Sequence, residues 1–228
     1  MISIIIPCYN EEYRLNNSLP EIKNYFHSIG ISNYEIIVVD DGSTDSTRNI
    51  AKKYNCTLTP PRENRGKGYS VKEGVMMAKG THVLLTDCDL ATPISYFDEF
   101  IKFIPQYDIV IASRALKESQ VTTSWFKRIM GRLANIPISL LIHDIKDSQC
   151  GFKLFDIDAA RRIFGKSFIE KWGYDFEILY LAQKLGYKIK EYPVQWTNQP
   201  GSKVKLSDYP ATLIELLKIW WHDYEKKS

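Results

Sequence analysis

The stretch Tyr34–Gly42 reads Tyr-Glu-Ile-Ile-Val-Val-Asp-Asp-Gly, a short apolar run that ends in two carboxylates and a glycine. Its apolar residues do not alternate with polar ones, which is typical of a strand buried on both faces of a parallel sheet. We expect Ser43 or Thr44 to cap a helix that follows and runs to Tyr54. The stretch therefore predicts a strand, a turn and a helix, with Asp40 and Asp41 at the carboxyl end of the strand.

Three more runs have the same character: Ile2–Pro7, His82–Thr86 and Ile109–Ala112. Buried strands that alternate with helical segments predict a mostly parallel sheet with helices on both faces, an α/β fold of three layers. Shorter or later strands are expected at Thr57–Thr59 and Ile189–Trp196, and a loop with a strand at Asp147–Phe155. The other segments with helical periodicity are Leu15–Ile29, Tyr69–Lys79, Pro93–Ile104, Ser124–Ile142, Ile169–Leu185 and Tyr209–Tyr224.

Polar residues follow the predicted strands where a ligand is expected. In open α/β sheets, ligands bind beyond the carboxyl ends of the strands. The residues at these ends are Pro7–Glu11, Asp40 and Asp41, Asp87 and Asp89, and Ser113 and Arg114.

Length and charge exclude several classes of protein. The chain has 228 residues, which fits one large domain, and a net charge of +3, too balanced to indicate nucleic acid as a partner. The four cysteines lack metal-ligand spacing, so we expect reduced thiols. A strand-like run directly follows Met1, and no apolar stretch reaches about 18 residues, so we predict neither a signal peptide nor a membrane-spanning helix.

Asp87-Cys88-Asp89 is the candidate metal site. Two carboxylates one residue apart at a strand end can share a hard cation such as Mg²⁺ or Mn²⁺, which also binds diphosphate oxygens. The alternative is a solvated pair of aspartates that starts a turn. The preceding strand and the helix start at Thr92-Pro93 favour metal.

The other polar clusters suit a phosphorylated ligand. Asp40 or Asp41 can accept hydrogen bonds from a ribose or a base, or can instead form a turn. The loop Asn64–Gly68, with Lys67, can approach phosphate, although it has neither the Walker A order nor a dinucleotide-binding glycine pattern and could equally be a plain surface turn. Arginines that can hold a second phosphate are Arg114, Arg128 and Arg132. Arg128 and Arg132 are spaced to share one face of a helix, where they either bind the phosphate or merely solvate the helix. Trp172, Asp175 and Glu177 can contact a sugar, or else belong to a buried helix.

In this order, the clusters resemble the inverting GT-A glycosyltransferases of family two. The residues that carry the resemblance are Ile4–Glu12, Val39–Asp45 and Thr86–Asp89, and the match extends from residue 2 to about 205. Within the family, the chain is similar to the polyprenyl-phosphate group, above all to dolichyl-phosphate β-glucosyltransferases. The segments that carry this closer similarity are Asn64–Gly68, Asp147–Phe155, Glu170–Glu177 and Gly201–Lys203.

The resemblance implies an activity and a set of site residues. It implies transfer of a hexose, glucose from UDP-glucose, onto a dolichyl or polyprenyl phosphate. The alternatives are a mannosyltransferase that uses GDP-mannose, or transfer to a saccharide hydroxyl with Asp175 as base. A binding module without catalysis is disfavoured because the carboxylate pair and Arg114 are all present. The residues expected at the nucleotide sugar are Pro7, Tyr9, Asn10, Glu11, Asp40, Asp41, Lys67, Asp87, Cys88, Asp89, Ser202 and Lys203. Those expected in catalysis are Asp89, Arg114, Arg132 and Asp175, with Asp87 and Asp89 as metal ligands.

The later part of the chain predicts membrane contact. We expect a GT-A domain over 1–205 and a C-terminal amphipathic helix over 206–228. Trp220 and Trp221 near Lys218, and Trp125 near Arg128, suit helices that lie at a lipid interface, although packing on the sheet or a dimer contact would also explain them. We therefore expect a cytoplasmic protein, peripheral on the cytosolic face of a membrane.

Overall fold

The computed structural model describes residues 1–123, 137–199 and 208–225. A seven-stranded sheet lies at its centre, in the order β3–β2–β1–β4–β7–β5–β8. Six strands run parallel, and β7 is antiparallel to both of its neighbours. The sheet is thus mostly parallel, as predicted. Its strands are β1 (Ile2–Cys8), β2 (Tyr34–Asp40), β3 (Thr57–Leu58), β4 (His82–Leu85), β5 (Ile109–Ser113), β7 (Lys153–Asp156) and β8 (Ile189–Pro193).

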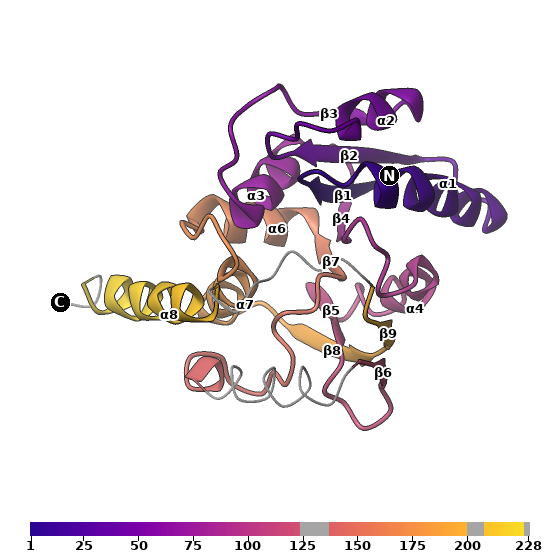
Figure 1. The fold of residues 1–228 in the computed structure, drawn as a ribbon. Helices are drawn as coiled ribbons and strands as arrows, with labels where there is room; N and C mark the ends of the chain where they lie inside the picture. Colours follow the sequence, from indigo (N-terminus) through magenta and orange to yellow (C-terminus); the bar gives the residue numbers. More distant parts are fainter. Residues whose placement is uncertain (124–136, 200–207, 226–228) are drawn as a thin grey trace.

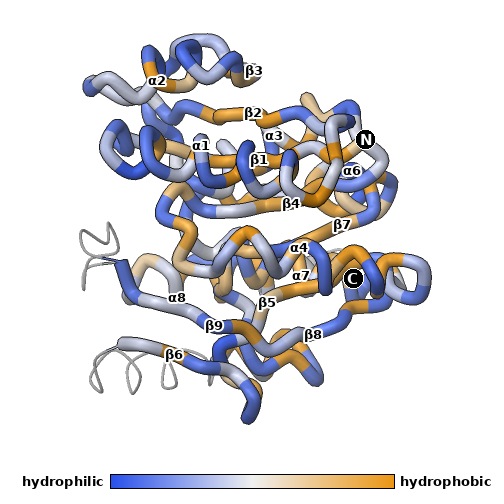
Figure 2. The backbone as a smooth tube through the Cα atoms, turned by 90° about the vertical axis from the view of Figure 1, so that its right-hand side faces the viewer, coloured by the Kyte–Doolittle hydropathy of each residue, from blue (hydrophilic) through white to orange (hydrophobic). Residues whose placement is uncertain are grey.

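Helices cover both faces of this sheet (Figure 1), which makes three layers. Successive strand residues point to opposite faces, so in β1 Ile5 joins one core while Ile4 and Ile6 join the other. Figure 2 shows β1, β4, β7 and β5 as hydrophobic segments that follow one another through the molecule. The first core is covered by α3 (Lys67–Met77), α6 (Ile157–Lys166), α7 (Tyr174–Lys184) and α8 (Asp208–Glu225). The second is covered by α1 (Glu12–Ser28), α2 (Thr47–Lys53) and α4 (Phe97–Phe100), which the 3₁₀ turn η1 (Ile94–Tyr96) precedes.

Two predicted boundaries at the amino end are wrong. Helix α1 begins at Glu12, three residues before the predicted start, because its polar first turn hides the helical periodicity. Helix α2 begins only at Thr47, and neither predicted cap residue caps it. The Ser43 hydroxyl instead accepts the Asn10 N–H at 2.8 Å, and the Thr44 N–H donates to Asn10 Oδ1 at 2.8 Å. These two residues join the loop after β1 to the loop after β2.

Later segments also differ from the prediction. The predicted strand Ile189–Trp196 is divided between β8 and β9 (Gln195–Thr197), and β9 pairs with β6 (Gln120–Thr122) in a separate ladder. The helix predicted from Ile169 begins at Tyr174, because the N–H groups of Phe168 and Ile169 bind the Glu177 carboxylate and fold that segment over the helix. Only η1 and α4 replace the longer helix predicted over Pro93–Ile104, and α6 was not predicted at all.

The helix predicted over Tyr209–Tyr224 is present as α8. Its Leu216 and Ile219 are buried in the same core as α7. The predicted boundary between residues 205 and 206 lies outside the described residues, as does most of the predicted helix over 124–142.

Candidate active site

The carboxyl ends of β1, β2 and β4 form one edge of the sheet. Cys8 is in register with Asp40, and Ile5 is in register with Leu85. The chain stays paired just past the strands, since the Asp41 N–H donates to the Cys8 carbonyl at 2.8 Å and the Thr86 N–H donates to the Ile5 carbonyl at 3.1 Å. The polar residues that follow these strands therefore gather at one edge, as the sequence predicts.

Asp87 and Lys67 form an ion pair at this edge. Lys67 is the first residue of α3, and its Nζ lies 2.7 Å from Asp87 Oδ1. Removal from water is the largest influence on the Lys67 ammonium and lowers its pKa, but Asp87, Tyr174 and Asp175 together leave the pKa well above its ordinary value. Removal from water likewise raises the pKa of the Asp87 carboxyl, yet Lys67 holds the pKa below its ordinary value. Asp87 is thus held as a carboxylate beside a cation.

Asp89 lies in a different environment. Its Oδ1 accepts the Ala91 N–H at 3.1 Å, and its side chain is half-buried. Removal from water, followed by the Asp87 charge, raises the pKa of the Asp89 carboxyl. The next residue, Leu90, has a φ of 45°, a backbone conformation that costs a leucine about 1–2 kcal/mol. The turn after β4 is therefore strained where it places two carboxylates side by side, a feature often found at functional sites.

Asp87 and Asp89 can supply part, but not all, of the ligand set of a divalent cation. They supply the hard oxygen atoms that Mg²⁺ and Mn²⁺ prefer. Within the described parts of the chain, no cluster of three or more His, Cys, Asp or Glu side chains could hold a metal ion by itself. An ion between Asp87 and Asp89 would therefore take further oxygen ligands from a phosphorylated substrate or from water.

A glycine and a buried ion pair support Asp87 from behind. A Cβ atom on Gly151 would lie 2.2 Å from Asp87 Oδ2, so only glycine leaves room for this carboxylate. Lys153 of β7 is fully buried, and its Nζ contacts the Asp175 carboxylate and the Cys150 carbonyl, the latter at 2.6 Å. The Lys153 charge also helps to lower the pKa of Asp87.

Asp40 and Asp41 are both engaged within the protein. Asp40 accepts the Ser43 N–H at 3.1 Å and pairs with Arg48 at 2.9 Å. The Asp41 carboxylate accepts the N–H groups of Arg65 and Gly66 at 3.0 and 2.7 Å, at the amino end of α3. Asp41 thereby fixes the predicted glycine loop beside Lys67. Asp40 thus takes the turn-forming role that the sequence allowed, while Asp41 joins two loops, and contact of either carboxylate with a nucleotide stays a prediction.

Arg114 is held by an aspartate that sequence reasoning did not assign to the site. Its Nε and Nη2 donate to the two Asp147 oxygens at 2.7 and 2.8 Å, and its own N–H donates to Oδ2 at 2.8 Å. Burial lowers the pKa of the guanidinium, but Asp147 more than reverses this and raises the pKa above its ordinary value. The guanidinium also lies over the Trp196 ring, 5.3 Å from its centroid. This fork-to-fork pairing fixes the direction of the side chain.

The loop after β1 has polar side chains near the same edge. Asn10 adopts a φ of 51° and joins this loop to Ser43 and Thr44, as described above. The Glu11 carboxylate pairs with Arg14 at 3.0 Å, and the Tyr9 ring is 40% exposed. Pro7 is the half-buried penultimate residue of β1. These residues lie where we predicted a nucleotide to bind, and their contact with it stays a prediction.

The Cys88 thiol points into the core. Its Sγ lies 2.8 Å from that of Cys8 and 3.3 Å from the Pro7 carbonyl, and both cysteines are buried. This packing favours a structural role for the Cys88 thiol. The Asp175 side chain is also buried, against Lys153, which favours a positioning role over proton abstraction. Four predicted residues, namely Arg128, Arg132, Ser202 and Lys203, lie outside the described residues.

Sequence reasoning missed the partners of the predicted residues. Lys153 carried a signal, because a lysine placed between Phe152 and Leu154-Phe155, in a run that suits a buried strand, needs a buried partner. Asp147 and Arg48 carried no comparable signal, because each lies in a segment with ordinary surface composition.

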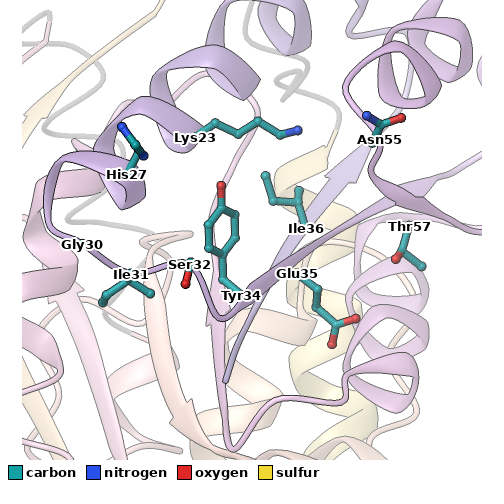
Figure 3. A pocket seen from close by; sticks show the side chains of 10 residues that line it. All are labelled: Lys23, His27, Gly30, Ile31, Ser32, Tyr34, Glu35, Ile36, Asn55 and Thr57. Carbon is teal, nitrogen blue, oxygen red and sulfur yellow. The ribbon is translucent and has the colours of Figure 1, made fainter.

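A hollow of about 680 Å³ lies at the opposite end of β2. Figure 3 shows its lining residues from α1 and the start of β2, among them Lys23, His27, Tyr34 and Glu35. Because these residues precede or begin the strand, the hollow is at the amino edge of the sheet. It is therefore separate from the carboxylate edge described above.

The fold is that of the GT-A glycosyltransferases. The chain superimposes on glucosyl-3-phosphoglycerate synthase from Mycobacterium tuberculosis, crystallised with Mn²⁺, UDP and glucosyl-3-phosphoglycerate. The TM-score is 0.71 at 17% identity, over 96% of this chain and 78% of that one. Mannosyl-3-phosphoglycerate synthase from Rubrobacter xylanophilus gives a TM-score of 0.74 at 16% identity, over 100% of this chain and 74% of that one. At such identities the likeness shows the fold alone.

Sequence comparison narrows the class further. The glycosyl transferase family 2 model matches residues 3–173. A dolichyl-phosphate β-glucosyltransferase of Dictyostelium discoideum is 39% identical over 223 residues, which cover 89% of this chain and 68% of that protein. The human protein of the same name is 34% identical over 224 residues, covering 89% and 69%. The chain belongs to glycosyl transferase family 2 and is a glycosyltransferase, as its motifs predicted.

Proposed function

We propose that this enzyme transfers glucose from UDP-glucose to a dolichyl or other polyprenyl phosphate, with inversion at the anomeric carbon. The supporting observation is that one edge of the sheet carries two separate charged groups of side chains, here called stations. Asp87 and Asp89 form the acidic station, and Arg114 forms the basic one. Curated relatives that match over most of the chain bear the name dolichyl-phosphate β-glucosyltransferase, which supports this acceptor and this sugar.

The acidic station is proposed to bind the donor. Asp87 and Asp89 would hold Mg²⁺ or Mn²⁺, which when bound offsets the negative charge of the diphosphate. Lys67, at the amino end of α3, adds a positive charge and a helix terminus that favours anions. The predicted nucleotide contacts from Tyr9, Asn10, Ser202 and Lys203 complete this proposal.

The basic station is proposed to bind the acceptor phosphate. Asp147 engages Nε–H and one Nη2–H of Arg114, which leaves both N–H groups of Nη1 and the second of Nη2 as donors to a phosphate oxygen. Arg132, predicted for the same role, would supply a second guanidinium. A phosphate monoester with a second pKa near 6 is mostly a dianion at neutral pH. Such a nucleophile needs no general base, so the residues only have to position two anions without mutual repulsion.

A saccharide hydroxyl as acceptor is less well supported. Such an acceptor would need a base, for which Asp175 was the candidate. The Asp175 carboxylate is buried and paired with Lys153, so taking up a proton would break that pair. The arrangement therefore favours an acceptor that is already ionised.

The proposed acceptor is a lipid, so we also propose that the enzyme works at the cytosolic face of a membrane as a peripheral protein. Among the helices described, none combines the length and the apolar character needed to cross a bilayer.

The test is a transfer assay that crosses donors with acceptors. UDP-glucose and GDP-mannose, each with radiolabelled sugar, are incubated with dolichyl phosphate or with a free saccharide, with and without EDTA. We expect label in the organic extract only with UDP-glucose, dolichyl phosphate and metal, and a β-linked product from the α-linked donor. Transfer of labelled mannose to the lipid, or of label to a water-soluble saccharide, would reject the proposal.

A further inference from the structure

The outer face of α8 is an uncovered apolar stripe. Its five members are spaced i, i+1, i+4, i+7 and i+8, so they share one side of the helix. Trp220 and Trp221 are 69% and 66% exposed, and the three aliphatic members are about half exposed. The stripe consists of Leu213, Ile214, Leu217, Trp220 and Trp221.

The inner face of the same helix is fixed to the body of the enzyme. Leu216 and Ile219 are buried in the core shared with α7. Glu215, the acidic residue in the middle of the helix, points inward and accepts the Gly173 N–H at 2.8 Å. The His222 ring contacts the Phe168 ring, with 4.7 Å between centroids. The stripe is therefore held outward by contacts on the opposite side.

The helix also lies close to the candidate active site. Gly173, which Glu215 holds, directly follows Trp172, and the Trp172 ring centroid is 6.0 Å from Lys67 Nζ. Figure 1 shows α8 beside α7 and extending away from the sheet at the margin of the molecule. The helix that carries the stripe is thus fixed to the segment that borders Lys67, which lies on the side of α8 opposite the stripe.

We propose that this stripe docks on a lipid bilayer, which deepens the proposed function by naming the surface that brings the enzyme to its acceptor. Paired tryptophans on an apolar helix face, with the exposed Lys218 at the flank, suit the boundary between headgroups and acyl chains.

A second copy of this chain fits the stripe less well than a bilayer does. Five side chains with these exposures offer on the order of 500 Å². A stable protein–protein interface needs about 800 Å² from each partner. A bilayer has no such minimum, because it receives a single helix face along its length.

Sedimentation with vesicles tests this docking. The vesicles contain phosphatidylcholine alone or with phosphatidylserine, and the variant is Trp220→Ser/Trp221→Ser. The matched control is Met76→Ser/Leu185→Ser, which removes one exposed apolar side chain from α3 and one from the residue that follows α7. We expect the native enzyme and the control to bind both kinds of vesicle, and the tryptophan variant to bind at least tenfold more weakly.

Several outcomes would overturn the docking surface. They are equal sedimentation of the native enzyme and the tryptophan variant, no sedimentation of the native enzyme, or a native dimer that the tryptophan substitutions dissociate in analytical ultracentrifugation. Glucose transfer separates this inference from the proposed function. The variant should keep native turnover with a water-soluble, short-chain isoprenyl phosphate and show at least a tenfold higher KM for dolichyl phosphate in vesicles. If the native enzyme glucosylates neither acceptor, the proposed function fails, and sedimentation still decides the docking.

Discussion

Replacing Gly151 by alanine should disable the site without touching a charged residue. The added Cβ would lie 2.2 Å from Asp87 Oδ2 and 2.7 Å from its Cγ. Ordinary contact needs about 3.5 Å, so the carboxylate must move by roughly 1 Å, which disturbs the 2.7 Å contact of its other oxygen with Lys67. A displacement of about 1 Å at a reacting centre can cost about 100-fold in rate. We therefore expect kcat/KM for glucose transfer to fall about 100-fold, equivalent to about 2.7 kcal/mol.

Gly165→Ala is the matched control for this experiment. Gly165 lies in α6, and an added Cβ there meets no heavy atom within 4 Å. Alanine in a helix should stabilise the fold by about 0.5–1 kcal/mol relative to glycine, with unchanged transfer. Both variants are assayed with UDP-glucose and dolichyl phosphate, and their folding is checked by thermal melting. If folded Gly151→Ala enzyme keeps kcat/KM within threefold of the native value, Asp87 does not need its observed position.

Three further predictions concern buried charges. Burial raises the pKa of Glu177 to about 7 from an ordinary 4.5, so the folded state binds more protons between these values. The free energy of unfolding should therefore fall by about 3 kcal/mol as pH rises from 4.5 to 7. Urea unfolding at both pH values should show a smaller fall in Glu177→Gln than in the native enzyme. An equal fall in both proteins would contradict the prediction. Lys153→Met should destabilise the fold by about 3–5 kcal/mol by leaving Asp175 buried and unpaired, and Lys153→Met/Asp175→Leu should recover most of this loss in urea unfolding; an additive double variant would refute the pairing. Asp89→Asn should abolish transfer while Tm stays level or rises, because one of two neighbouring like charges is removed; a large drop in Tm would assign Asp89 a structural role instead.

The sheet and its functional edge were predictable because both depend on local pattern. The unbroken apolar runs of β1 and β2 require burial on two faces, and a parallel sheet brings the residues after such strands together. Asp87 and Asp89 could be found for this reason alone. Helix α8 was predictable because its apolar residues recur with helical spacing.

The pairings within the site were not predictable, because they join residues distant in the sequence. Arg114 meets Asp147 across 33 positions, and Lys153 meets Asp175 across 22. The same limit explains the wrong cap for α2, since the Ser43 hydroxyl is taken by the distant Asn10. The sequence around Gly151 does not indicate that this residue packs against Asp87. That contact is visible only in the structure.

The most direct test of the account is a crystal structure of the enzyme with Mn²⁺ and UDP-glucose, in which anomalous scattering locates the metal. We predict one strong peak at roughly 2–2.5 Å from a carboxylate oxygen of Asp87 or Asp89 and from the diphosphate oxygens. A donor bound with its diphosphate elsewhere, or a metal on Asp147 or Asp175 instead, would contradict it.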